Sequence, residues 1–507
     1  MSKRISRSLA LVIILTLAMV ALPAKNPATG SASQRASLTS SASRNAALVA
    51  ATNEVLKETS EIRELAILRP VKSSAQSRTE IERMLIKNLD EEMTAADMHA
   101  TELSLRKFGL AAPDFEYRPF IIKLLTEQVA GYYDPKVQEF HLADWLELEG
   151  QKPVMAHELT HALQDQHFNL RRFEKWPRGD ADAELAVHAL IEGDATLSMT
   201  LYMARNPLVA LAFSRSLTTG VATEQFNQAP RAMRESLIFP YLQGMEWTTQ
   251  LYKRGGWTLV SNAFTKLPLS SEQILHPEKY FSYERPTKVV LPDVTSLLNA
   301  AASNQQSASS TQPPAGTAGA SPALGRARSS SQRPGENRPL SAVHTQLPTA
   351  HHPLPTSSWH RIESDVNGEW NYYLILDQFL SAPAESKRAA AGWAGDRYAV
   401  YEGPKGQVFL AQVAVWDTNS DAREFFDAYV KRTELRYPGA TRLDPSELKP
   451  ETRNSKLETG NAESNTRNIY SWATNEGSVV IELRGSRVVI LEGVPSGTDV
   501  DALRKLL

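Results

Sequence analysis

Apolar residues in the first half of the chain recur mostly at helical spacing. Ile81, Met84, Leu85 and Leu89 fall on one helical face within the run from residue 78 to residue 107. Residues three and four apart lie on the same side of a helix. The pattern therefore predicts an amphipathic helical start to the folded part of the chain at residue 78.

Downstream of this start, the pattern predicts a small hairpin and two more helices. Strand-like runs at 129–133 and 137–142 flank the turn signal Asp134-Pro135-Lys136. Residues 153–165 and 184–196 consist mainly of good helix formers. Turn residues between two β-prone runs favour a hairpin, so we expect a small sheet accompanied by helices.

The last third of the chain alternates between strand and helix patterns. Runs rich in β-branched residues occur at 408–415 and 478–491, and a helical pattern lies between them at 421–435. Residues 299–357 are rich in Ser, Ala, Gln, Pro and Gly, which predicts a flexible linker. We therefore expect an α+β protein whose smaller α+β domain is tethered without a fixed geometry.

These patterns divide the chain into five predicted parts. They are an export signal at 1–24, a disordered Ala/Ser-rich spacer with the start of the helical lead-in at 25–77, a first folded domain at 78–298, the linker at 299–357 and the second domain at 358–507. The signal is predicted because Lys3, Arg4 and Arg7 precede an apolar run, Leu9–Leu22, that is short for a bilayer span. We expect a secreted or periplasmic protein, with a retained N-terminal anchor as the alternative.

Charge and cysteine content exclude several classes of function. The chain has 55 basic and 57 acidic residues and a formal net charge of -2, so nothing favours a nucleic-acid partner. Cysteine is absent, which excludes a thiolate metal site, a disulfide framework and a cysteine nucleophile. An exported protein of this composition relies on the size of its core.

The run from His157 to His161 carries an H-E-x-x-H motif within good helix formers. Histidines four residues apart on a helix can approach one Zn²⁺, and Glu158 between them can project toward the attacking water. A carboxylate there takes a proton from the zinc-activated water and returns one to the leaving amine. The motif predicts His157 and His161 as zinc ligands and Glu158 as general base.

A catalytic zinc needs a third protein ligand. The best candidate is Glu192, 31 residues after His161 in the second predicted helix. Glu184 and His188 precede it at intervals of four residues on roughly the same face, and Asp194 follows closely. The sequence favours Glu192 and leaves the other three open.

His167 is a further candidate for the third ligand. It stands where H-E-x-x-H-x-x-G-x-x-H places its last histidine. That pattern needs a helix break at glycine, and the residue at that position is Gln164. We therefore expect His167 to be solvated or structural.

The His157 motif followed by Glu192-Gly193-Asp194-Ala195 resembles the gluzincin superfamily of zinc metallopeptidases. The pieces Gly131–Pro135, His157–Phe168 and Ser271–Tyr280 are similar to a largely uncharacterised family of secreted bacterial and archaeal proteins with a gluzincin-like core. The resemblance covers roughly residues 78–290. It implies a zincin-like domain with a small sheet and an active-site helix, and a zinc held by the two histidines and Glu192. It also implies an edge strand that binds extended peptide.

Four other positions carry weaker signals. His276, before Pro277, is a candidate hydrogen-bond donor to the oxyanion, or else closes a loop through backbone carbonyls. Asp165 either orients an imidazole or is an exposed helical carboxylate. Tyr132 and Tyr133 either face the cleft or are ordinary strand aromatics.

The sequence therefore predicts an exported zinc metallopeptidase that acts on a peptide or protein substrate. Cell-envelope association through the N-terminal segment or the C-terminal domain is an accompanying expectation. One alternative is a catalytically inactive zincin-fold protein for binding or assembly in the envelope. The other is a zinc amidase that acts on a nonpeptide amide.

Overall fold

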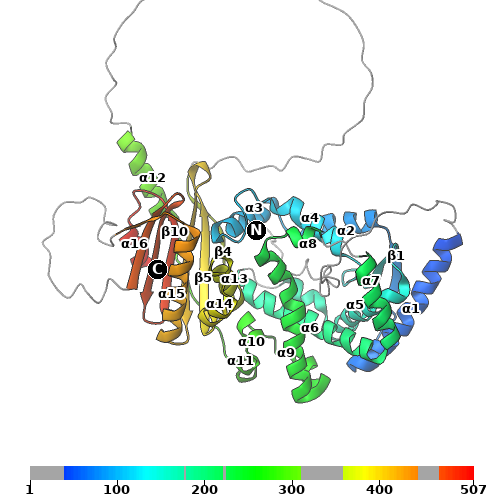
Figure 1. The fold of residues 1–507 in the computed structure, drawn as a ribbon. Coiled ribbons are helices and arrows are strands. Elements are labelled where there is room, and N and C mark those ends of the chain that lie inside the picture. Colours follow the sequence, from blue (N-terminus) through cyan, green and yellow to red (C-terminus); the bar gives the residue numbers. More distant parts are fainter. Residues whose placement is uncertain (1–38, 176–178, 221–223, 310–357, 444–467) are drawn as a thin grey trace, which may run out of the picture.

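A computed structural model describes residues 39–175, 179–220, 224–309, 358–443 and 468–507. The predicted signal at 1–24 and most of the predicted linker lie outside the described residues. The fold is mixed α+β, as predicted. A helical half with a three-stranded sheet lies beside a half built on a seven-stranded sheet (Figure 1).

The first half is dominated by helices. They are α1 (Thr39–Arg63), α2 (Arg78–Glu92), α3 (Ala95–Phe108), α4 (Tyr117–Gln128), α5 (Leu148–Phe168), η3 (Leu170–Lys175), α6 (Ala181–Arg205), α7 (Pro207–Gly220), α8 (Glu224–Gln228), α9 (Arg231–Ala263), α10 (Ser271–Leu275) and α11 (Pro277–Ser282). The predicted start at residue 78 is a helix boundary, because Ser77 and Glu80 form a capping box. Gly109, in the left-handed conformation, ends α3.

Residues 25–77 were predicted to be a disordered spacer with the start of the helical lead-in, and the described part of this range contains α1, which also covers residues predicted to be disordered. This helix packs against α5 and buries Leu48, Val55 and Leu56. Alanine is a strong helix former, so an Ala-rich stretch with a few large apolar residues becomes helical once a neighbour covers those residues. The expected start of folding at residue 78 is therefore too late.

The small sheet consists of β1 (Lys72–Gln76), β2 (Gly131–Asp134) and β3 (Glu139–Ala143) in the order β1-β3-β2. β2 and β3 form the predicted antiparallel hairpin, and β1 pairs with β3 in parallel. Within the described residues β2 pairs with β3 alone, so β2 is an edge strand. The chain passes from β3 into α5, which carries the H-E-x-x-H motif.

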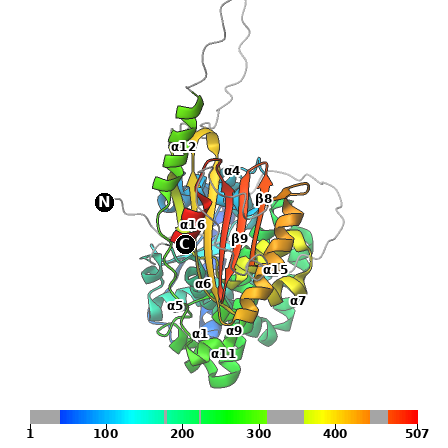
Figure 2. The same cartoon turned by 90° about the vertical axis from the view of Figure 1, so that its left-hand side faces the viewer.

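The second half is built on an antiparallel sheet of order β4-β5-β6-β10-β9-β8-β7. Its strands are β4 (His360–Asp365), β5 (Trp393–Glu402), β6 (Val408–Trp416), β7 (Thr441–Leu443), β8 (Ile469–Thr474), β9 (Gly477–Arg484) and β10 (Arg487–Val494), and its other elements are α12 (Thr295–Ser309), α13 (Gly368–Leu380), α14 (Pro383–Ala390), η4 (Pro404–Gly406), α15 (Asn419–Arg436) and α16 (Val500–Leu506). Figure 2 views the sheet from its outer side, where α12 and α16 lie.

Both faces of this sheet are buried, and the side-chain alternation shows why. On β9, Val479 and Ile481 join the core under α13 and α15, whereas Val480 joins the core under α12 and α16. On β10, Val488 joins the core under α13 and α15, and Val489 joins the core under α12 and α16. Successive strand residues point to opposite faces, so near-continuous apolar strands require cover on both sides.

The two halves share one apolar core, so the expectation of a freely tethered second domain is wrong. Apolar residues of α5, α6 and α9 belong to the same cluster as those of α13, α15 and β9. Polar contacts also cross the boundary, since Arg432 of α15 donates to the carbonyl of Phe108 and Lys107 pairs with Glu476 at 2.9 Å. Contacts between distant segments are invisible to local pattern analysis.

None of the described helices combines the length and apolar character that a bilayer crossing requires.

Candidate metal centre

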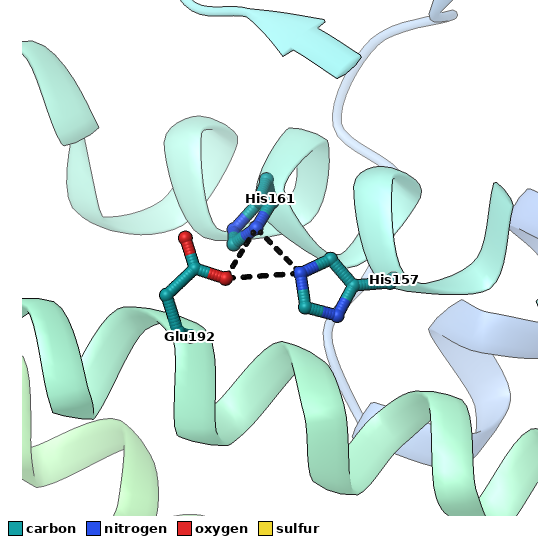
Figure 3. Close-up of side chains that lie close together, drawn as sticks. All are labelled: His157, His161 and Glu192. Carbon is teal, nitrogen blue, oxygen red and sulfur yellow. Dashed lines mark hydrogen bonds and ion pairs between the residues drawn. The ribbon is translucent and has the colours of Figure 1, made fainter. Parts of the chain in front are cut away.

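Helices α5 and α6 pack against each other and bring three predicted ligands together (Figure 3). The Nε2 atoms of His157 and His161 lie 3.1 Å apart. Oε2 of Glu192 lies 3.0 Å from Nε2 of His157 and 3.5 Å from Nε2 of His161. All three residues are buried, and their ligand atoms lie within 4.8 Å of one another.

This geometry fits a shared cation. A tetrahedral ion with ligands at about 2.0–2.1 Å would separate its ligand atoms by about 3.3 Å, close to the distances found here. Oε1 of Glu192 is also buried without a hydrogen-bond partner, an arrangement that a neighbouring cation would relieve. The three residues can hold a metal ion, and two imidazoles with one carboxylate suit several divalent metals, zinc among them.

The charges in the group are strongly coupled. Burial alone would raise the pKa of Glu192, but the imidazoles of His161 and His157 outweigh it and lower that pKa to about 2. Burial also disfavours a charged His161, yet the carboxylates of Glu192 and Glu158 raise its pKa to about 9. Burial lowers the pKa of His157. Glu192 thus balances the positive charge of protonated His161, and a divalent cation could take the place of the His161 proton.

A buried chain of hydrogen bonds orients His161. Its Nδ1 lies 2.8 Å from Oε1 of Gln164, which accepts the ring proton. The amide nitrogen of Gln164 donates to Oδ2 of Asp194 at 2.9 Å, and Arg63 donates to Oδ1 of the same carboxylate. A proton held on Nδ1 leaves the Nε2 lone pair directed at the metal position.

Glu158 lies next to the ligands but outside the three-residue group. Its side chain is buried, and Oε2 accepts a hydrogen bond of 2.9 Å from the backbone N–H of Tyr133 on β2. The carboxylate therefore sits between α5 and the edge strand β2. Tyr133 also anchors the strand to α5, because its hydroxyl donates to Asp165 at 3.0 Å.

The alternative third ligands make other contacts. His167 hydrogen-bonds the carbonyl of Ala66 at 2.7 Å, because α5 continues without a break through Gln164. Asp194 is engaged by Arg63 and Gln164. His188 lies one turn before Glu192 and lines a neighbouring cavity. Glu184 lines a different cavity.

The structure gives His276 and Asp165 contacts other than those predicted for them. His276 hydrogen-bonds Glu369 of α13 at 2.9 Å, so its described partner is in the second half of the molecule and outside the metal group. Asp165 is a buried carboxylate that contacts Arg69, Tyr133 and the backbone N–H of Leu170, and it does not orient an imidazole through these contacts. Gln164, one residue earlier, has that role.

Sequence reasoning missed Gln164 and Tyr241 at this site. Gln164 follows His161 by three residues on one helix, a spacing that brings side chains together and is therefore a usable signal. Tyr241 of α9 stacks on His157, with ring centroids 6.0 Å apart and planes 25° apart. No sequence pattern joins Tyr241 to the motif, because only the packing of α9 on α6 brings them together.

Comparisons with known proteins concern the second half alone. Neither the curated proteins nor the solved structures include a match to the chain. The segment from β4 to α16, residues 356–504, matches the model of a family described as a domain of unknown function, DUF8575.

Proposed function

We propose that the protein is a zinc-dependent peptidase that hydrolyses peptide bonds with Glu158 as general base. The observation that carries the proposal is a buried carboxylate, Glu158, beside a buried His-His-Glu group to which it does not belong. A purely structural metal site has no use for such a carboxylate.

The roles of the residues follow from their positions. His157, His161 and Glu192 would hold the metal, which supplies Lewis-acid chemistry that polarises a carbonyl and acidifies water. Glu158 takes the proton of the attacking water and transfers it to the leaving amine. Its contact with the N–H of Tyr133 holds the carboxylate beside the scissile bond of a peptide added along β2.

The edge of β2 favours peptide as the substrate class. Ala143 of β3 donates to the carbonyl of Ala130, so in the antiparallel register Ala130, Tyr132 and Asp134 face β3. Gly131 and Tyr133 between them face away from β3 in an antiparallel ladder, and the N–H of Tyr133 is bonded to Glu158. Main-chain groups at a sheet edge can pair with an extended peptide, and such pairing does not select a nonpeptide amide.

The test compares zinc content and hydrolysis of an unstructured protein in four forms: wild type, Glu158→Gln, Glu192→Ala and the control Glu246→Ala, which changes an exposed residue of α9. Glu158→Gln should retain zinc and lose about 100-fold or more in rate. Glu192→Ala should lose zinc and activity, and Glu246→Ala neither. A wild type that binds no zinc and cleaves nothing would favour an inactive binding module, and hydrolysis confined to nonpeptide amides would favour the amidase.

We also propose that the protein is exported, because Lys3, Arg4 and Arg7 precede the apolar run at 9–22 in the manner of an export signal. The mass of the mature N-terminus would distinguish a removed signal from a retained anchor. Accumulation of the whole chain in the cytoplasm would contradict export.

A further inference from the structure

A cavity of about 340 Å³ lies directly beside the candidate metal centre. Glu192, which belongs to the metal group, lines it together with His188 and Tyr241. Since Tyr241 also stacks on His157, the cavity and the metal group share a wall. A group bound at the metal could therefore extend directly into this space.

The walls of the cavity come from both halves of the molecule. α3, α6 and α9 contribute one side, including Phe108, Leu185 and Leu237. α13 and β5 contribute the other side, including Leu374, Ile375 and Tyr398. The second half therefore completes this cavity, and the helical half alone would leave it open on one side.

The lining is mainly apolar. Its polar side chains include His188 and Glu192 beside the metal group, and Glu363, Asp365 and Asn371 on the side of the second half. Nε2 of His188 is buried there, next to the metal group, without a hydrogen-bond partner. Buried polar atoms are normally satisfied, so this atom beside the metal end of a mainly apolar cavity indicates a ligand with a polar end and an apolar body. A peptide has this form, because its backbone is polar and its side chain can be apolar.

We propose that this cavity binds a large apolar side chain of the substrate. We also propose that residues 356–504, the segment that matches the family model, complete the pocket that selects this side chain. The inference rests on the proposed peptidase function and adds its specificity. A volume of about 340 Å³ is far larger than an alanine side chain needs. Phenylalanine and leucine would bury much more apolar surface there.

The experiment uses the full-length, zinc-loaded protein and two peptide hydroxamates that differ only in bearing a phenylalanine or an alanine side chain next to the metal-binding group. Calorimetry gives their dissociation constants, and cleavage of matched peptides gives kcat/KM. The wild type should prefer phenylalanine over alanine by about tenfold or more in both measurements.

Two variants fill the cavity from opposite walls. Asn371→Trp projects from α13, and Ser236→Phe projects from α9. Each should reduce the preference to about twofold or less by weakening phenylalanine binding, with zinc content unchanged. Gln378→Trp, on α13 but outside the lining, is the matched control and should keep the preference.

The outcomes separate the two proposals. Equal binding of both hydroxamates by the wild type, or an unchanged preference in folded Asn371→Trp and Ser236→Phe, would overturn the pocket assignment and leave the peptidase proposal intact. Failure of the wild type to bind zinc, either hydroxamate or any peptide would overturn both.

Discussion

At the scale of single residues, the site depends on how each imidazole is oriented. Gln164 holds the Nδ1 side of His161, and Asp194 with Arg63 holds Gln164 in turn. All of these side chains are buried. Because both ends of the Gln164 amide are used, a shorter or apolar side chain cannot replace it without leaving polar groups unpaired.

Gln164→Leu should therefore weaken zinc binding about 10–100-fold, the usual effect of removing a group that orients a metal-ligating histidine. Competition with a chromophoric chelator measures the change. Gln250→Leu, at an exposed position of α9, is the control. An affinity equal to that of the wild type would show that His161 needs no orienting partner.

Zinc binding should also depend on pH through His161. Its pKa is raised to about 9, whereas Glu192, with its pKa lowered to about 2, stays ionised at neutral pH. Below pH 9 the metal must displace the His161 proton, so affinity should rise by about tenfold per pH unit between pH 6 and 8. Calorimetry in two buffers of different ionisation enthalpy should give one proton released per ion. A pH-independent affinity would contradict this assignment.

At the scale of elements, the contact between α6 and α9 sets the position of Glu192. Gly193 and Gly244 face each other so closely that a Cβ on Gly193 would lie 2.2 Å from the backbone of Gly244. Glycine lets the two helix backbones touch. The same approach brings Tyr241 over His157 and closes the cavity wall.

Gly193→Ala should separate these helices. Alanine is the better helix former, so its intrinsic propensity would stabilise the chain by about 1 kcal/mol, whereas backbone overlap should cost about 1–3 kcal/mol or more. We expect net destabilisation in urea unfolding and weaker zinc binding. Thr200→Ala, at an exposed position of α6, should stay within about 0.5 kcal/mol. A Gly193→Ala protein that is more stable than wild type would show that the helices tolerate separation.

At the scale of the whole molecule, a buried charge cluster joins the two halves. Arg432 pairs with Glu492 at 2.9 Å with both side chains fully buried, and Arg436 pairs with the same carboxylate at 2.8 Å. Both arginines also donate to carbonyls at the end of α3, those of Phe108 and Lys107. Together with the shared apolar core, this cluster should make the halves unfold as one unit.

Arg432→Met should destabilise the protein by about 3–5 kcal/mol, because it leaves the Glu492 carboxylate and the Phe108 carbonyl with fewer partners in a buried environment. Urea unfolding followed by circular dichroism measures the loss. Arg388→Met removes an exposed pair with Glu424 and should change stability by less than about 1 kcal/mol. Two separate unfolding transitions in the wild type would contradict the single cooperative unit.

Much of the candidate site could be predicted from the sequence because it is local. His157, Glu158 and His161 are fixed relative to one another by one helix, and the β2–β3 hairpin follows from its turn residues. The α+β class and the major strands of the second half follow from the period of their apolar residues. In each case the decisive interactions join residues close in the chain.

Only the tertiary structure decided the rest. The sequence favoured Glu192 over Glu184 and His188, but the packing of α6 against α5 determines which turn faces the histidines. The helical state of residues 39–63, the role of Gln164 and the cavity shared by the two halves depend on partners far away in the chain. Local spacing specifies which side chains share a face, whereas the burial of apolar surface between distant elements determines what that face meets.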